Sequence, residues 1–166
     1  MFPSFHNWDW WTRKTTLAQY VYNDEEVQRH FDMRLWACVS DPFDVKTIVA
    51  MLIESATKKK PESLEMDPLQ SELRAKIDGK RYLLVLDDVW NENPSTWSDL
   101  EKLLVGGLRG SKVLITTRSE KVAKITRSVS QYAVSQYPLG GLSESNSWIY
   151  LRNLHLKIRK SHIIQS

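Results

Sequence analysis

The sequence has little cysteine, little net charge and no long apolar run, and each shortage excludes a class of protein. Its single cysteine, Cys38, cannot form an intramolecular disulfide and fits a reducing compartment. No stretch approaches the roughly 18 consecutive apolar residues of a transmembrane helix. Residues 1–11 lack the charged start and apolar run of a signal peptide. We therefore expect a cytoplasmic protein without a membrane span.

Charge gives no sign of a nucleic-acid partner. The net charge is +3 over 166 residues, and acidic and basic residues are interspersed. The short basic run from Lys58 to Lys60 is followed by Pro61 and acidic residues, which is typical of a solvent-exposed helix end. Hydrophobic residues make up 42% of the chain and charged residues 26%, so the sequence can bury the core of one globular domain.

The most informative stretch is an apolar run that ends in two acids. Residues 82–86 are all apolar, too few for a membrane span and too continuous for a strand with one exposed face. A central strand of a parallel sheet, buried on both faces, has this composition. Asp87 and Asp88 follow at its carboxyl end, which is where open α/β sheets bind ligands. The alternative is a buried strand followed by an exposed Asp-Asp turn.

Helical and extended patterns alternate along the chain, with short connections. The expected helices cover residues 14–23, 44–56, 67–77, 97–104 and 119–125, and the expected strands cover residues 33–40, 82–87, 111–117 and, more weakly, 131–137. Asp44 and Ser119 are expected N-caps, as is Asp67 with Pro68 at the first helical position, and Gly79 is expected to end the third helix. This alternation predicts an α/β fold, a parallel sheet with helices on both faces.

A second motif points to a phosphate ligand. Phosphate-binding loops follow the pattern G-x-x-x-x-G-K-[ST], in which the glycine-rich backbone wraps the phosphates, the lysine reaches the β- and γ-phosphates and the hydroxyl binds Mg²⁺. Lys14 and Thr15, which open a helix, match the end of this pattern. Such a pair is common at exposed helix starts, but it becomes more specific beside a strand that ends in Asp87 and Asp88. Together they indicate a Rossmann-like fold of the P-loop NTPase class.

Four longer segments, residues 14–19, 31–40, 83–90 and 110–118, occur in the order and spacing of a known family. They resemble the nucleotide-binding (NB-ARC) domain of plant disease-resistance proteins, and the resemblance covers residues 14–149. Trp90, directly after the two acids, is typical of the coiled-coil NBS-LRR class of these receptors. The resemblance implies an ADP/ATP-dependent switch in defence signalling, with Mg²⁺ as a second cofactor and at most very slow ATP hydrolysis.

The resemblance also implies a role for individual residues. It assigns nucleotide contacts to Lys14, Thr15, Thr16 and Arg118, Mg²⁺ coordination to Thr15 and Asp87, and orientation of the attacking water to Asp88. Lys14 would contact the β- and γ-phosphates, and Arg118 would sense the γ-phosphate. Two of these residues have simpler explanations: Arg118 as a surface residue at a helix start, and Asp88 as a cap of the turn at Asn91.

The expected phosphate loop departs from the family pattern. Trp8 and Arg13 occupy its two glycine positions, and bulky side chains cannot follow the left-handed turns of such a loop. Asp9 would also place a negative charge beside the phosphates, so the loop as written should not hold a nucleotide.

A shift of reading frame is one hypothesis for this departure. Tryptophan is encoded by TGG and glycine by GGN. A one-base shift of the codons for residues 6–13, with one base restored before the Lys14 codon, can give Ile-Ile-Gly-Ile-Gly-Gly-Leu-Gly, a buried strand followed by a complete loop. Residues 150–166 lose the family pattern in a similar way. We therefore treat residues 1–13 and 150–166 as atypical ends, which are out of frame on this hypothesis and genuine tails on its rival.

Three functions follow as hypotheses. The first is the ADP/ATP-binding switch domain of a plant immune receptor, expected here as a fragment without the signalling domain and leucine-rich repeats. The second is a non-enzymatic fragment that pairs with full-length NBS-LRR receptors as a decoy or adaptor. The third is a pseudogene product that cannot bind nucleotide. Stoichiometric ADP retained by the purified chain would refute the statement that the loop as written cannot bind. Nucleotide-independent co-purification with a full-length relative would favour the second hypothesis, and low solubility with exposed apolar surface would support the third.

Overall fold

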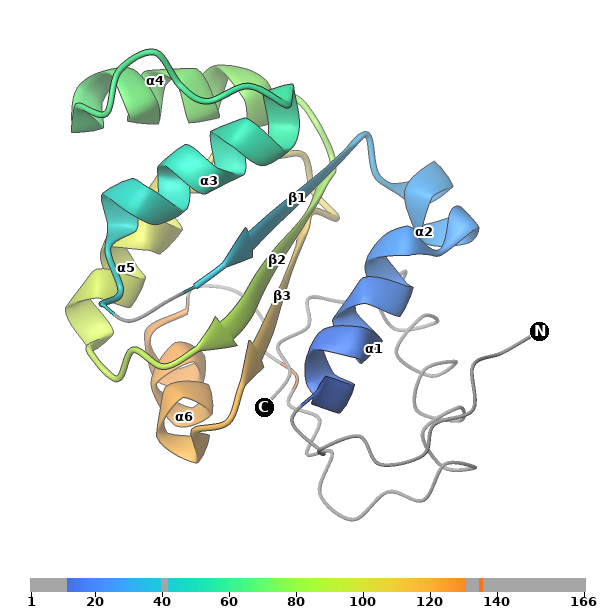
Figure 1. Ribbon diagram of the computed structural model, residues 1–166, viewed down its shortest axis with the longest axis vertical. Coiled ribbons are helices and arrows are strands. Elements are labelled where there is room, and N and C mark those ends of the chain that lie inside the picture. Colours follow the sequence, from blue (N-terminus) through green and yellow to red (C-terminus); the bar gives the residue numbers. More distant parts are fainter. Residues whose placement is uncertain (1–11, 40–41, 131–134, 136–166) are drawn as a thin grey trace.

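A sheet of three parallel strands organises the computed structural model, which describes residues 12–39, 42–130 and 135. The strands are β1 (Met33–Cys38), β2 (Tyr82–Val89) and β3 (Lys112–Thr117), and β2 lies between the other two (Figure 1). Met33 pairs with Tyr82 at the start of the sheet, and Leu83 pairs with Lys112. The parallel α/β sheet expected from the sequence is confirmed.

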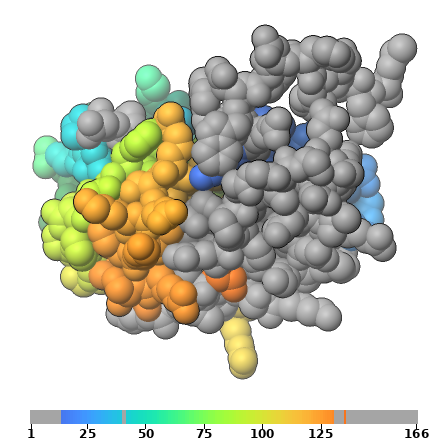
Figure 2. Space-filling model, turned by 90° about the horizontal axis from the view of Figure 1, so that it is seen from below, coloured from blue at the N-terminus to red at the C-terminus, as the bar shows by residue number. Residues whose placement is uncertain are grey.

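Helices cover both faces of the sheet, as expected. α1 (Thr12–Asn23) and α2 (Glu25–His30) lie on one face, and α3 (Val45–Thr57), α4 (Met66–Ile77) and α5 (Pro94–Leu103) lie on the other (Figure 1). α6 (Glu120–Val129) follows β3, and in the view from below in Figure 2 it lies beside α5. Ser130, just after α6, donates a hydrogen bond of 2.6 Å to Glu101 of α5. None of the helices within the described ranges is long and apolar enough to cross a membrane.

Among the described residues, the sheet divides the buried side chains into two clusters of unequal size. Because successive side chains of a strand point to opposite faces, β2 contributes to both. Leu83 and Val85 pack with α1 and α2 in the smaller cluster, whose members are Leu17, Ala18, Val21, Val27, Phe31, Leu83, Val85 and Leu114. Leu84 and Leu86 belong to the larger cluster, which includes the apolar faces of α3, α4 and α5. Burial of β2 on both faces confirms the expectation from its unbroken apolar run.

Capping residues fix several helix ends. Asp44 at the start of α3 and Ser119 at the start of α6 accept backbone N–H groups of the first helical turn, as expected. Asp24 caps α2 in the same way, and this short helix was not anticipated from the sequence. Gly79 follows the end of α4 with a φ of +64°, a conformation that glycine adopts without steric cost.

Some element boundaries differ from the expected ones. Asp67 is not an N-cap, because α4 begins one residue before it and Glu65 precedes the helix without a side-chain cap. Pro68 is then the third helical residue, which the first turn tolerates because its N–H groups have no partner within the helix. β2 continues to Val89 and α6 continues to Val129, beyond the expected ends at residues 87 and 125. The expected strand at residues 131–137 lies outside the described residues, except for residue 135.

Candidate functional site

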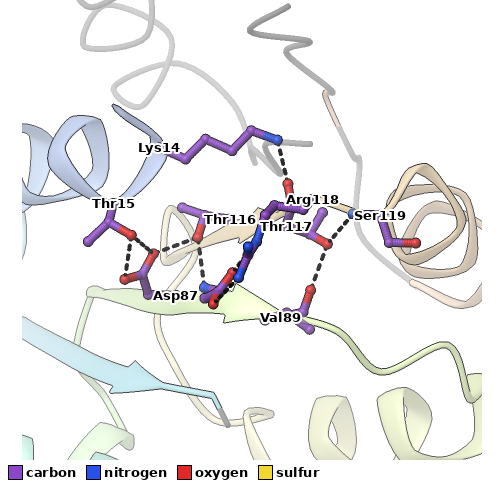
Figure 3. A network of polar contacts seen from close by, with 9 residues as sticks. Lys14, Thr15, Asp87, Val89, Thr116, Thr117, Arg118 and Ser119 are labelled. Carbon is purple, nitrogen blue, oxygen red and sulfur yellow. Dashed lines mark hydrogen bonds and ion pairs between the residues drawn. The ribbon is translucent and has the colours of Figure 1, made fainter. Parts of the chain in front are cut away.

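The start of α1 meets the carboxyl ends of β2 and β3 at one end of the sheet. Lys14 and Thr15 lie in the first turn of α1, Asp87 and Asp88 lie at the end of β2, and Arg118 directly follows β3 (Figure 3). The structure thus brings these predicted site residues together from three elements that are far apart in the sequence. Thr16, the remaining predicted residue, is the next residue of α1 and is half-buried.

Asp87 is a buried carboxylate held by two threonine hydroxyls. The Thr15 Oγ1 lies 3.0 Å from each carboxylate oxygen and donates a hydrogen bond to the carboxylate (Figure 3). The Thr116 Oγ1 donates a second hydrogen bond, of 2.5 Å, to Asp87 Oδ1. Asp87 is only 4% exposed. Burial of a carboxylate is costly unless donors such as these satisfy it.

This donor set fits Mg²⁺ bound together with phosphate. Mg²⁺ prefers hard oxygen ligands and usually takes one or two from the protein, leaving the rest to water and substrate phosphates. Thr15 and Asp87 offer a hydroxyl and a carboxylate oxygen 3.0 Å apart. The described residues contain no group of three or more His, Cys, Asp or Glu side chains that could hold a metal ion by themselves. Thr15 and Asp87 could supply two oxygen ligands to such an ion, and phosphate and water could supply the others.

Lys14 places a buried amine at the same end of the sheet. Its Nζ donates a hydrogen bond of 2.5 Å to the backbone carbonyl of Thr117, the last residue of β3. Burial lowers the pKa of the Lys14 amine, the nearby charge of Arg118 lowers it further, and Asp88 acts in the opposite direction. An anionic ligand between these cations would favour the charged form of Lys14. The first turn of α1 also favours an anion, because its N–H groups point toward the ligand side.

Arg118 is held between an acid and an aromatic ring. Its Nε lies 3.1 Å from Asp88 Oδ1 and its Nη2 lies 2.9 Å from Asp88 Oδ2, which is a two-point ion pair. The guanidinium carbon lies 4.2 Å from the centre of the Trp90 ring. At the following turn, the Asn93 N–H donates a hydrogen bond to the side-chain oxygen of Asn91. Asp88 is therefore engaged by Arg118, and the simpler interpretation of Asp88 as a cap of that turn does not describe its contacts.

The carboxyl end of β2 departs from regular strand geometry. Asp88 has a φ of +57°, in the left-handed region that non-glycine residues rarely adopt. Its N–H donates a hydrogen bond of 2.8 Å to the Thr116 hydroxyl. The Thr117 hydroxyl donates one of 2.6 Å to the carbonyl of Val89 on the far side of Asp88. Thr116 and Thr117 thus support the end of β2 from the neighbouring strand.

Two residues of this site were not assigned a role from the sequence. The sequence assigns no role to Thr116, and it makes Trp90 only typical of one class of receptor. A pair of threonines directly before an arginine at the end of an apolar strand is the signal for the first. The signal for Trp90 is its position, two residues after Asp88, because an arginine that pairs with the acid can also stack on the aromatic ring.

The expected phosphate loop lies mostly outside the described residues. Residues 8–11 are not described, and α1 begins at Thr12. Arg13, at the position of the second motif glycine, is therefore the second residue of a helix. The statement that this loop does not hold a nucleotide stays a prediction from the sequence.

Comparison with known proteins identifies the family of this chain. The chain matches the NB-ARC domain family over residues 12–159. Disease resistance protein RGA2 of Solanum bulbocastanum is 45% identical over 138 residues, which make up 82% of this chain and 14% of that protein. Putative disease resistance RPP13-like protein 1 of Arabidopsis thaliana is 40% identical over 137 residues, 81% of this chain and 12% of that protein. The chain spans only a small part of the length of these relatives. It belongs to the NB-ARC family of nucleotide-binding domains.

Proposed function

We propose that this chain is the ADP/ATP-binding region of a cytoplasmic plant immune receptor, in which the bound nucleotide acts as a conformational switch in defence. The observation that carries the proposal is the meeting of Thr15 and Asp87, 3.0 Å apart, beside Lys14 and Arg118 at the carboxyl end of the sheet. Family membership and the printed names of the relatives support it.

Each residue of the site has a distinct role in this proposal. Thr15 and Asp87 would hold Mg²⁺, which supplies charge neutralisation at the terminal phosphates when it is bound. Lys14 provides positive charge for the β- and γ-phosphates from the first turn of α1. Burial and the charge of Arg118 lower its pKa, and phosphate oxygens beside the amine would oppose both effects by favouring its charged form.

Asp88 and Arg118 restrain one another. Both oxygens of Asp88 accept hydrogen bonds from the Arg118 guanidinium, so in this arrangement the carboxylate is turned toward Arg118 and part of its acceptor capacity is used. A γ-phosphate that attracts Arg118 would release Asp88 at the same time. Sensing of the γ-phosphate and activation of water would then be one event, and hydrolysis without that event would be very slow.

A second function is favoured by a different observation. Trp8, Asp9 and Arg13 stand where a phosphate loop requires glycine or an uncharged residue. A chain with this loop would bind nucleotide weakly and act as a non-enzymatic fragment that pairs with full-length NBS-LRR receptors, or it would have no function. The two proposals differ in a single measurable property, the affinity for ADP.

Calorimetric titration with ADP and Mg²⁺ tests both proposals. We compare the chain with a glycine-loop variant that carries His6→Ile, Asn7→Ile, Trp8→Gly, Asp9→Ile, Trp10→Gly, Trp11→Gly, Thr12→Leu and Arg13→Gly. The variant should bind ADP, and Lys14→Ala within it should weaken binding at least about tenfold, the loss of one charge-assisted contact. Lys124→Ala, which removes an exposed lysine of α6, is the matched control and should have no effect.

The outcomes separate the proposals. Tight ADP binding by the chain as written would refute the statement that its loop cannot hold a nucleotide. Failure of the folded glycine-loop variant to bind ADP would refute the nucleotide-switch proposal itself. Weak ADP binding by the chain and tight ADP binding by the variant would indicate that Lys14, Thr15 and Asp87 can still serve a nucleotide site and that only the phosphate loop is defective.

A further inference from the structure

Asp87 and Asp88 lie at the same site because the pairing of β2 with β3 shifts register between Leu86 and Val89. Successive side chains of a regular strand point to opposite faces, so two adjacent acids would normally be separated by the sheet. Leu86 pairs with Ile115, whereas Val89 pairs with Thr117, so β2 contains one more residue than β3 over this interval. This is a β-bulge, and the left-handed conformation of Asp88 lies within it.

One buried hydroxyl connects both acids at this bulge. The Thr116 Oγ1 donates to Asp87 Oδ1 at 2.5 Å and accepts the backbone N–H of Asp88 at 2.8 Å. A hydroxyl has a single hydrogen to donate, and in Thr116 it is directed to Asp87. Thr116 is 2% exposed, so water does not replace these contacts easily. The same atom therefore orients the carboxylate of one acid and fixes the backbone of the next.

The neighbouring threonine contacts the bulge differently. The Thr117 hydroxyl donates to the carbonyl of Val89 at 2.6 Å and accepts the N–H of Ser119 at 3.1 Å. It is as deeply buried as Thr116 and belongs to the same strand. Both hydrogen bonds of the Thr117 hydroxyl go to backbone groups beyond the bulge. A change at Thr117 therefore tests support of the strand end, whereas a change at Thr116 also tests the placement of the two acids.

We propose that Thr116 is the positioning residue for both acids of the site. Through its one hydroxyl it turns the Asp87 carboxylate toward the Thr15 hydroxyl and keeps the Asp88 peptide in the conformation that presents its carboxylate to Arg118. Without the hydroxyl, the Asp88 N–H loses its acceptor, and the left-handed conformation loses the contact that offsets its strain. The consequence of this arrangement for Mg²⁺ rests on the proposed function, whereas the arrangement itself does not.

Hydrogen exchange of the Asp88 amide in the full chain tests the proposal without any ligand. Thr116→Val keeps the shape and removes the hydroxyl, Thr116→Ser keeps the hydroxyl, and Thr117→Val is the matched control. In Thr116→Val, exchange at Asp88 should accelerate about tenfold relative to the Leu84 amide, as expected when one hydrogen bond is lost. Thr116→Ser and Thr117→Val should leave this ratio within about twofold of that in the parent chain.

The exchange ratio decides the proposal in either direction. An unchanged ratio in Thr116→Val, or an equal increase in Thr117→Val, would overturn it. If Thr116→Val does not fold, Thr116→Ala is compared with Thr116→Ser instead. Alanine and serine are both smaller than threonine, but only alanine lacks the hydroxyl. An increase in Thr116→Ala alone supports the proposal, and equal ratios in the two variants overturn it.

The consequence for Mg²⁺ is tested separately in the glycine-loop variant. Added Thr116→Val should reduce the gain in ADP affinity that Mg²⁺ provides and leave the affinity without Mg²⁺ unchanged, and added Thr117→Val should alter neither. An Mg²⁺-dependent gain that survives Thr116→Val would overturn this consequence. Absence of any ADP binding in the glycine-loop variant would refute the proposed function and leave the exchange result to stand on its own.

Discussion

Two of the contacts that hold Arg118, one with Asp88 and one with Trp90, have geometries from which their strength follows. The ion pair with Asp88 joins side chains that are 38% and 39% exposed, and half-exposed pairs of this kind contribute about 0.5 kcal/mol. The guanidinium carbon lies 4.2 Å from the centre of the Trp90 ring, and such contacts at exposed sites contribute about 0.5–1 kcal/mol. Together they favour the observed position of Arg118 by about 1 kcal/mol, roughly fivefold.

Double-mutant cycles measure these two contributions separately. Arg118→Ala is combined with Asp88→Asn and, in a second cycle, with Trp90→Leu, and the free energy of unfolding is measured in urea. Each cycle should give a coupling of about 0.5 kcal/mol at low salt. In 1 M NaCl the Debye length is about 3 Å, so the coupling to Asp88 should fall toward zero. The coupling to Trp90 should persist, because the ring excludes ions from one side of the guanidinium.

The exposed pair of Lys121 and Glu92, 3.3 Å apart, is the control. Its side chains are more exposed than those of the Arg118 pair, so its coupling should be smaller and equally sensitive to salt. A coupling of zero in both Arg118 cycles at low salt would refute the reasoning, as would a coupling to Asp88 that salt does not change. A restraint of about 1 kcal/mol is weaker than a charge-assisted hydrogen bond to phosphate, about 1.5–3 kcal/mol. A γ-phosphate within reach would therefore displace Asp88 from Arg118.

Two further predictions concern stability. Gly107→Ala should lower the free energy of unfolding by about 1–3 kcal/mol, because the added methyl would overlap the buried ring of Tyr82 and lie 2.8 Å from Ser111 Oγ; urea unfolding at the stability of the parent chain would contradict this. Hydrogen bonds from the Thr47 hydroxyl and from backbone N–H groups lower the pKa of Asp44, so its capping contribution is complete above the unfolded pKa of about 3.9 and is lost as pH falls through the folded pKa. Asp44→Ala should therefore cost about 1 kcal/mol at pH 7 and less below about pH 4, whereas a cost independent of pH would contradict the linkage.

The central strand and the location of the site could be predicted because their signals are local. An unbroken apolar run fixes β2 as a strand buried on both faces, and Asp87 at its end marks the edge where ligands bind. The caps at Asp44 and Ser119 are equally local, since each side chain binds the backbone two or three residues further on. α2 carried similar signals, with Asp24 before two acids and basic residues in its last turn, and was overlooked because it is short.

The arrangement of the acids could not be predicted, because it depends on contacts between distant residues. Asp88 adopts its left-handed conformation beside Thr116, 28 residues further along the chain, and nothing in the Asp-Asp pair itself announces a bulge. The start of α4 was misplaced for a different reason. Asp67 and Pro68 are typical of an N-cap and the first helical residue, but both also fit within the first turn of a helix. The local sequence is therefore compatible with a start at Met66 or at Pro68.

Among the described residues, the unequal division of the core leads us to expect that α1 separates from the sheet more easily than the helices on the other face. Among the described residues, α1 with Lys14 and Thr15 rests on the smaller cluster, whereas Asp87 belongs to a strand that also faces the larger one. A layer with less buried apolar surface detaches at a lower free energy than the rest. The site lies across that seam, so a ligand that touches both sides fastens one layer to the other. At one hundred times its Kd, such a ligand adds about 2.7 kcal/mol to the closed form. If the site binds such a ligand, we expect its occupancy to make the region beneath α1 less accessible to a protease or to a neighbouring segment.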